Sequence, residues 1–224
     1  MTNTKSVSIA TIITIPALIT LGITVLRLVG ELQHWSPWFF NTAAGGGAAL
    51  VGISWLPIIF GPYFAVKLAG AGDGPSGAGK AIGFSFLALV IYALAGFLFG
   101  KTIGHPSFLT LLALLLMLFA AFVPGVGWRS LGNTLLAYAF AARIPVLIVM
   151  YLAMSGNGGQ GWGTHYDAVA PPFAPLPLGT KYLYTAVLPQ MTTWIGWTVV
   201  VGSVFGTIAA AVAGRGKRVA PAAA

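Results

Sequence analysis

The chain has 224 residues, of which 58% are hydrophobic and 6% charged, and its mean hydropathy is +0.91. Because a soluble domain carries about 25% charged residues, this composition excludes a water-exposed surface and predicts an all-α polytopic integral membrane protein, a single transmembrane domain over residues 1–224. The net charge of +8 comes from thinly spread basic residues that flank apolar runs, which is typical of orientation signals and excludes the clustered basic face of a nucleic-acid-binding protein.

The apolar runs predict a bundle of about six transmembrane helices, at approximately residues 6–33, 44–68, 81–100, 106–123, 131–154 and 191–214. The first run has about 23 apolar residues, more than the ~7–15 of a signal-peptide core, so we expect it to be retained as a helix. The second run contains Pro57 and Pro62, which remove two backbone donors, so we expect this helix to be bent or locally unwound.

A long loop is predicted over residues 155–190, between the fifth and sixth helices. It begins with a glycine-rich run, contains His165, Tyr166 and Asp167, and then passes through a proline-rich stretch. Its length of about 36 residues exceeds the ~12–15 beyond which loops tend to be functional or disordered, and its aromatic residues argue against disorder. We interpret it either as a lid over an outer mouth or as a docking surface for a partner.

Six helices place both termini on one side of the membrane. Seven basic residues then share that side and three lie on the other: Lys5, Lys67, Lys80, Arg129, Arg215, Lys217 and Arg218 against Arg27, Lys101 and Lys181. The positive-inside rule therefore predicts cytoplasmic termini, a cytoplasmic tail over residues 215–224 and a bacterial-type inner membrane. The loop at 155–190 is then extracytoplasmic, on the same side as the three histidines.

The end of the first predicted helix carries a compact polar cluster. Arg27, Glu31 and His34 stand at i, i+4 and i+7, so their side chains share one helix face. Glu31 is the only glutamate in the chain, and a carboxylate near lipid needs a partner, which predicts an ion pair with Arg27. Two interpretations stay open: a structural ion pair beside an interfacial histidine, or a substrate, proton or metal site at the outer mouth.

Arg143 lies near the middle of the fifth predicted helix, two residues before Pro145. An arginine at the centre of a transmembrane helix costs at least ~2.5 kcal/mol on insertion scales, so we expect it to face the bundle interior, a partner or water. Because acidic residues are few, the expected partner is a backbone carbonyl freed by Pro145 or by the bent second helix, or else an anionic ligand. A structural role is the alternative to binding an anionic substrate or lipid headgroup.

Signatures of cofactors and catalysis are sparse. The chain has no cysteine, which excludes thiolate metal sites, Fe–S clusters and a catalytic thiol, and it has no nucleophile elbow G-x-S-x-G. We therefore assign no catalytic residue and no cofactor. One metal hypothesis stays open, at His34, His105, His165 and Asp167, although no two histidines have a binding-motif spacing such as H-x-x-x-H.

Small residues recur every four positions along the sixth predicted helix, at Gly202, Gly206, Ala210 and Gly214. Such a stripe permits close approach of another helix, which we interpret as packing inside the bundle, with a homo-oligomer interface as the alternative. The other expected partners are membrane lipids and other membrane subunits, and no nucleic acid is expected.

Taken together, the sequence favours a small transporter or channel-like permease, passive or anion-favouring, over an enzyme. The broken second helix, Arg143 and the polar cluster would line its path. The alternative is a non-catalytic accessory or assembly subunit of a larger membrane complex, and a membrane-embedded metalloenzyme comes third. A proton-driven mechanism is disfavoured, because pumps place several carboxylates through the membrane and only Glu31 stands there, at the edge.

Overall fold

The computed structural model describes residues 8–46, 49–102 and 107–218, and every regular element in this part of the chain is helical. Within these described residues, five helices are long and apolar enough to cross a membrane, which confirms the all-α class and is consistent with a membrane-embedded protein. The α-helices are α1 (Ile9–Leu32), α2 (Leu56–Gly70), α3 (Ala78–Thr102), α4 (Phe108–Ala120), α5 (Pro124–Gly127), α6 (Arg129–Gly159), α7 (Leu178–Tyr182) and α8 (Ile195–Arg218).

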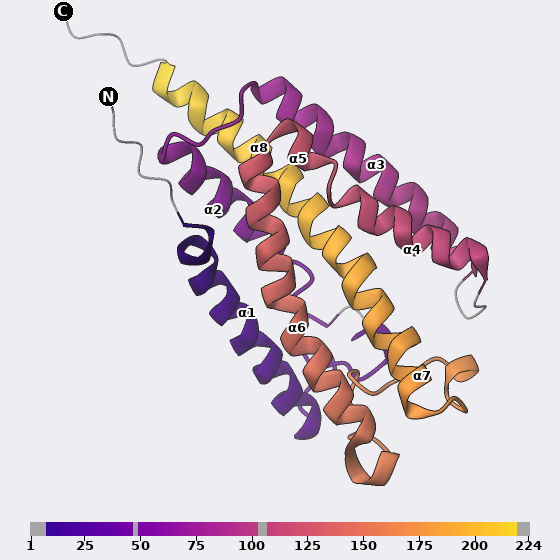
Figure 1. Ribbon diagram of the computed structural model, residues 1–224. Helices are drawn as coiled ribbons and strands as arrows, with labels where there is room; N and C mark the ends of the chain where they lie inside the picture. Colours follow the sequence, from indigo (N-terminus) through magenta and orange to yellow (C-terminus); the bar gives the residue numbers. More distant parts are fainter. Residues whose placement is uncertain (1–7, 47–48, 103–106, 219–224) are drawn as a thin grey trace, which may run out of the picture.

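The bundle is built around α8, which packs against α2, α3, α4 and α6 (Figure 1). On one flank α1 lies along α6, and on the other α3 and α4 form an antiparallel pair. The start of α1 and the end of α8 lie at one end of the bundle, and α7 lies at the opposite end, which we call the α7 end.

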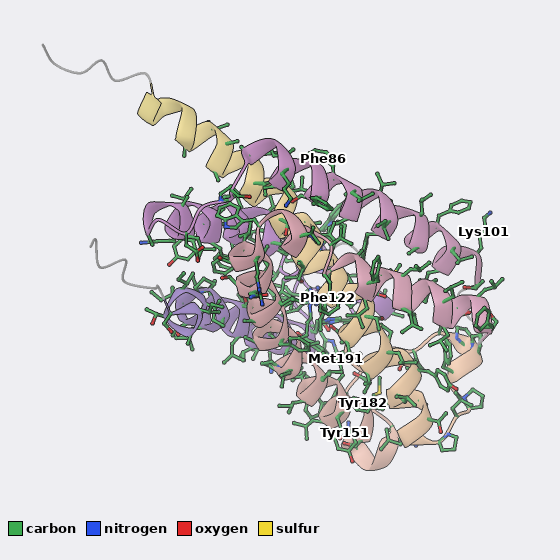
Figure 2. The ribbon with its side chains drawn as sticks, turned by 45° about the horizontal axis from the view of Figure 1, so that its top comes forward. Phe86, Lys101, Phe122, Tyr151, Tyr182 and Met191 are labelled. Carbon is green, nitrogen blue, oxygen red and sulfur yellow. The ribbon has the colours of Figure 1, made fainter. Side chains whose placement is uncertain are left out.

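Large apolar side chains cover the outside of the bundle. Phe86 of α3 and Phe122, which follows α4, lie on its surface (Figure 2), and Leu94 and Phe97 of α3 are 66% and 70% exposed. A surface of this kind is unfavourable in water and suits contact with lipid chains.

The contact between α2 and α8 depends on glycine. A methyl group at Gly61 would collide with the carbonyl of Gly202, and one at Gly206 would lie 2.8 Å from the carbonyl oxygen of Gly61. Both Gly202 and Gly206 are buried in this contact, so the first half of the small-residue stripe packs inside the bundle, as predicted. Gly214, the last residue of the stripe, is exposed.

The second helix is shorter than its apolar run predicts. An α-helix was expected over 44–68, but α2 begins at Leu56, and Pro57 occupies its first turn, where a missing N–H removes no helical bond. The residues before it form one 3₁₀ turn, Ala44–Gly46, followed by bends. Gly45 and Gly46 have φ angles of 75° and 80°, which no α-helix contains, so the chain cannot be helical there. We call residues 41–46 and 49–55 the irregular segment.

The predicted loop over 155–190 is present but about half as long as expected, because helix enters it from both sides. α6 continues to Gly159, with non-helical backbone angles at Gly156–Gly158, and helical structure resumes at Leu178. Two π-helical turns, Leu183–Val187 and Gln190–Trp194, join α7 to α8. Pro189 lies between them and has no N–H to give to a regular helix, so the wider turns accommodate it. The non-helical part shrinks to residues 160–177 with one 3₁₀ turn, and we call it the outer connection.

Candidate functional site

Glu31 joins the end of α1 to the outer connection. Its carboxylate is 1% exposed and accepts a hydrogen bond of 2.8 Å from Nε of Arg27, one turn earlier on the same helix. On its other side, the main-chain N–H of His165 donates to Oε2 at 2.8 Å. Nδ1 of His165 lies 2.6 Å from Oε1 and 2.8 Å from Oε2. The predicted pairing of Arg27 with Glu31 is therefore confirmed in the structure.

Arg27 also holds the irregular segment against α1. Its Nη2 donates to the main-chain carbonyls of Asn41, at 3.0 Å, and Gly46, at 2.8 Å. A Cβ atom at Gly46 would lie 2.8 Å from the same nitrogen, so the close approach of the guanidinium requires glycine there. The guanidinium thus satisfies two carbonyls that no helix satisfies, which is how irregular backbone is tolerated between packed helices.

The histidine of this cluster is His165 and not His34. α1 ends at Leu32, and His34 lies in the following turn with a φ angle of 53° and an exposed side chain. The expected i+7 position on the helix face is lost because the helix stops before it. His165, which the sequence offered only as a metal candidate, reaches Glu31 across 134 positions of the chain.

The three metal candidates that the structure describes, His34, His165 and Asp167, do not gather into a cluster. Asp167 accepts hydrogen bonds from the main-chain N–H groups of Trp162, Gly163 and Thr164 and from the Thr164 hydroxyl, so its carboxylate closes a turn of the outer connection. His105 lies outside the described residues. Within the described ranges no three His, Asp or Glu side chains gather as a metal site would require. Metal binding at these residues stays a prediction.

Arg143 is buried in the middle of α6 without an acidic partner. It is 4% exposed, and its guanidinium carbon lies 4.8 Å from the centre of the Trp194 ring. Nη1 is 3.4 Å from Oε1 of Gln190, and Nε has no hydrogen-bond partner. Among the described side chains, Glu31 forms an ion pair with Arg27 and a hydrogen bond with His165, and neither contact includes Arg143. Its neighbours Gln190 and Trp194 both come from the second π-helical turn, and the expected carbonyl or anionic partner stays a prediction.

These groups surround one cavity of about 420 Å³, which we call the polar cavity. Arg143 and Met150 of α6, Arg27 of α1 and His165 of the outer connection line it. Further lining comes from the irregular segment and from the second π-helical turn, at Gly45, Gly52, Ile53, Ser54, Gln190, Thr193 and Trp194. Sequence reasoning missed this second group, because Pro57 and Pro62 predict a bent helix but not which side chains line a cavity, and residues 183–190 were expected to form a loop.

The polar cavity carries a net positive charge. Burial lowers the pKa of the His165 imidazole, against the raising effect of its bond to Glu31, so the ring is neutral at pH 7. Burial also raises the pKa of the Tyr166 phenol, whose hydroxyl donates to the carbonyl of Thr24 at 3.1 Å. The negative charge of Glu31 neutralises the positive charge of Arg27, so the positive charge of Arg143 remains uncompensated.

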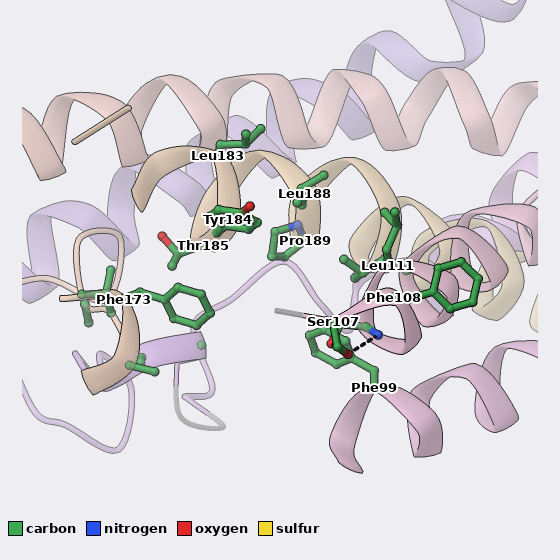
Figure 3. Close-up of a pocket in the computed structure, with 17 residues that line it drawn as sticks. Phe99, Ser107, Phe108, Leu111, Phe173, Leu183, Tyr184, Thr185, Leu188 and Pro189 are labelled. Carbon is green, nitrogen blue, oxygen red and sulfur yellow. Dashed lines mark hydrogen bonds between the residues drawn. The ribbon is translucent and has the colours of Figure 1, made fainter. Parts of the chain in front are cut away.

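A second cavity of about 660 Å³ adjoins the first, and we call it the apolar cleft. Figure 3 shows Phe173 and Tyr184 on one side of it and Phe108 and Leu111 of α4 on the other. The two cavities share five lining residues: Gly45, Phe99, Ala168, Thr185 and Pro189. The positively charged polar cavity and the apolar cleft therefore lie side by side at the α7 end of the bundle.

Comparison of the chain with protein-family models, with curated proteins and with solved structures finds no match, so its function has to be argued from this site.

Proposed function

We propose that the protein is a small anion-favouring membrane transporter in which Arg143 binds the transported anion inside the polar cavity. One observation carries the proposal: a buried arginine with no acidic partner lines a cavity large enough for a small organic ion. An ionisable group inside a membrane protein is expensive to keep and by default indicates function. Cavities of this size, about 300–1,000 Å³, are the usual ligand sites of proteins.

The charges inside the cavity favour an anion over a cation. Arg27 and Arg143 line the cavity with two positive charges, and Glu31, which pairs with Arg27 but does not line the cavity, adds one negative charge, so the sum is +1. A singly charged anion would neutralise the site, with the Arg143 side chain on the cavity wall as its positively charged partner. The Trp194 ring against the guanidinium would keep the donor group in one orientation.

The backbone around the cavity supports transport. Broken helices frequently form the substrate sites of transporters, because unwound backbone lines a cavity there. Here the irregular segment and the two π-helical turns both border the polar cavity. The outer connection lies over it and is tied to α1 by the contact between His165 and Glu31, which makes this contact a candidate gate.

For orientation, we propose that the α7 end faces outward and that the termini lie in the cytoplasm of a bacterial-type inner membrane. Lys67, Lys80 and Arg129 lie at the end opposite α7, whereas Lys101 and Lys181 lie at the α7 end (Figures 1 and 2). This distribution supports the proposal through the positive-inside rule.

The test is uptake of radiolabelled acetate, benzoate and inorganic phosphate into vesicles that contain the purified protein. We expect uptake of at least one of these anions, and a loss of at least tenfold in Arg143→Gln. Arg129→Gln is the matched control, because it removes the same charge from an exposed position on the same helix. Its uptake should equal that of the unmodified protein.

Thermal unfolding of each variant separates function from folding. Equal uptake by Arg143→Gln and the unmodified protein, with both variants folded, would contradict the proposal. Absence of uptake for all three anions would contradict it as well, provided that the reconstituted protein is intact.

A further inference from the structure

We infer that the anion is an amphiphile, with one negatively charged headgroup at Arg143 and a single alkyl chain in the apolar cleft. This inference rests on the proposed function and adds the class of substrate.

The first argument is the position of the two cavities. Gly45, Ala168 and Pro189 belong to the walls of both, so the polar cavity and the apolar cleft are at most one layer of residues apart. A ligand whose charge is held by Arg143 therefore has apolar surroundings directly beside its headgroup. A small polar anion would leave the cleft unused.

The second argument is the chemistry of the cleft. Its lining includes Phe108, Leu111, Phe173, Leu183 and Leu188 and carries no charged side chain among the residues that the structure describes around it. An alkyl chain gains free energy in such surroundings in proportion to the apolar area removed from water. An aqueous anion without a chain gains nothing there.

The third argument is access. Phe108 lines the cleft and is 76% exposed, so the cleft reaches the apolar outer surface of the bundle. Figure 3 shows its ring at the edge of the site, away from Tyr184 and Pro189. A chain that is dissolved in the bilayer can enter from this side, while the headgroup moves to the buried cation.

Binding of a series of straight-chain carboxylates, from propanoate to dodecanoate, tests the inference. The protein is placed in nanodiscs of phosphatidylcholine, which carries no net charge, and empty nanodiscs give the partition into lipid. Affinity, referred to the free aqueous concentration, should rise about fourfold per added methylene until the cleft is full. Arg143→Gln should weaken binding of every member of the series by a similar factor, because the headgroup contact is common to all.

A variant of the cleft tests where the chain lies. Leu111→Trp fills the cleft. The affinity of this variant should therefore rise little with the chain length of the carboxylate, while its affinity for propanoate should stay unchanged. Leu115→Trp is the matched control, since Leu115 is an equally exposed leucine of α4 that does not line the cleft. If the affinity of Leu111→Trp rose with chain length as steeply as that of the unmodified protein, the inference would be overturned.

The remaining outcomes separate the inference from the proposed function. If short anions bind through Arg143 but affinity does not rise with chain length, the amphiphile is refuted and anion transport stands. If no anion binds better to the unmodified protein than to Arg143→Gln, both are refuted. Displacement of dodecanoate by phosphatidylglycerol added to the nanodiscs would identify a two-chain membrane lipid and overturn the single-chain assignment. Tighter binding of dodecyl phosphate than of dodecanoate would support the inference and identify the headgroup as phosphate.

Discussion

Replacing Glu31 by glutamine removes the carboxylate that holds α1 to the outer connection. Three donors converge on it: Nε of Arg27, the main-chain N–H of His165 and Nδ1 of His165. An amide has one acceptor oxygen, so its NH₂ group must face one of these donors. The positive charge of Arg27, which is 8% exposed, would also lose its counter-ion.

The expected size follows from these contacts. Removing one partner of a buried ion pair costs about 3–5 kcal/mol. Arg27 keeps its bonds to the carbonyls of Asn41 and Gly46, so we expect the lower end, a loss of about 3 kcal/mol in the free energy of unfolding. For a chain of this length that corresponds to a melting temperature lower by about 6–12 °C.

Thermal unfolding in mild detergent, followed by the loss of monodisperse protein in size-exclusion chromatography, measures the effect of Glu31→Gln. Asp73→Asn is the control, because this exposed carboxylate bonds only to the Ser130 hydroxyl among the described groups, at 2.7 Å, and its loss should change little. The double variant Arg27→Gln/Glu31→Gln should lose less stability than the two single variants added together. A melting temperature of Glu31→Gln within about 2 °C of the unmodified protein, or an additive double variant, would refute the reasoning.

Three further predictions concern packing, pH and the outer connection. Gly61→Ala should lower stability by about 1–3 kcal/mol through the collision with α8, whereas Gly70→Ala, which meets open space, should not; thermal unfolding of the two variants compares them. Because the pKa of His165 is lower in the folded protein than in the unfolded chain, stability should fall as the pH drops below about 6.5, and His165→Gln should flatten that part of the profile measured from pH 8 to 5. Asp167→Ala should free three main-chain N–H groups and speed cleavage of the outer connection in limited proteolysis, and an unchanged rate would contradict its role in the turn.

Local features of the site could be predicted from the sequence, and its long-range contacts could not. The spacing of Arg27 and Glu31 predicts their pairing, because one turn of helix brings i and i+4 together. The meeting of Glu31 with His165 depends on how the outer connection folds over α1, which no local pattern records. The same holds for Gln190, whose place beside Arg143 follows from the packing of two distant helices.

The two errors in the helix bounds have local physical causes. Hydropathy alone does not distinguish residues 44–46 and 49–55 from a helix, and the decisive positive φ angles at Gly45 and Gly46 belong to residues that hydropathy treats as neutral. The second error is the end of the loop, which was predicted to extend to residue 190, although two π-helical turns continue the helix past Pro189.

The short α2 makes the bundle unequal in height around its circumference. Its 15 residues rise about 22 Å, whereas the 25 residues of α3 rise about 38 Å, and a typical hydrocarbon core is about 30 Å thick. Ile59 and Val66 of α2 are 53% and 48% exposed, so this short helix would face lipid directly in a membrane. The bilayer should therefore become thinner beside α2, whereas beside α3 either the bilayer should thicken or the helix should tilt. Lipids with shorter chains should relieve the mismatch on the α2 side.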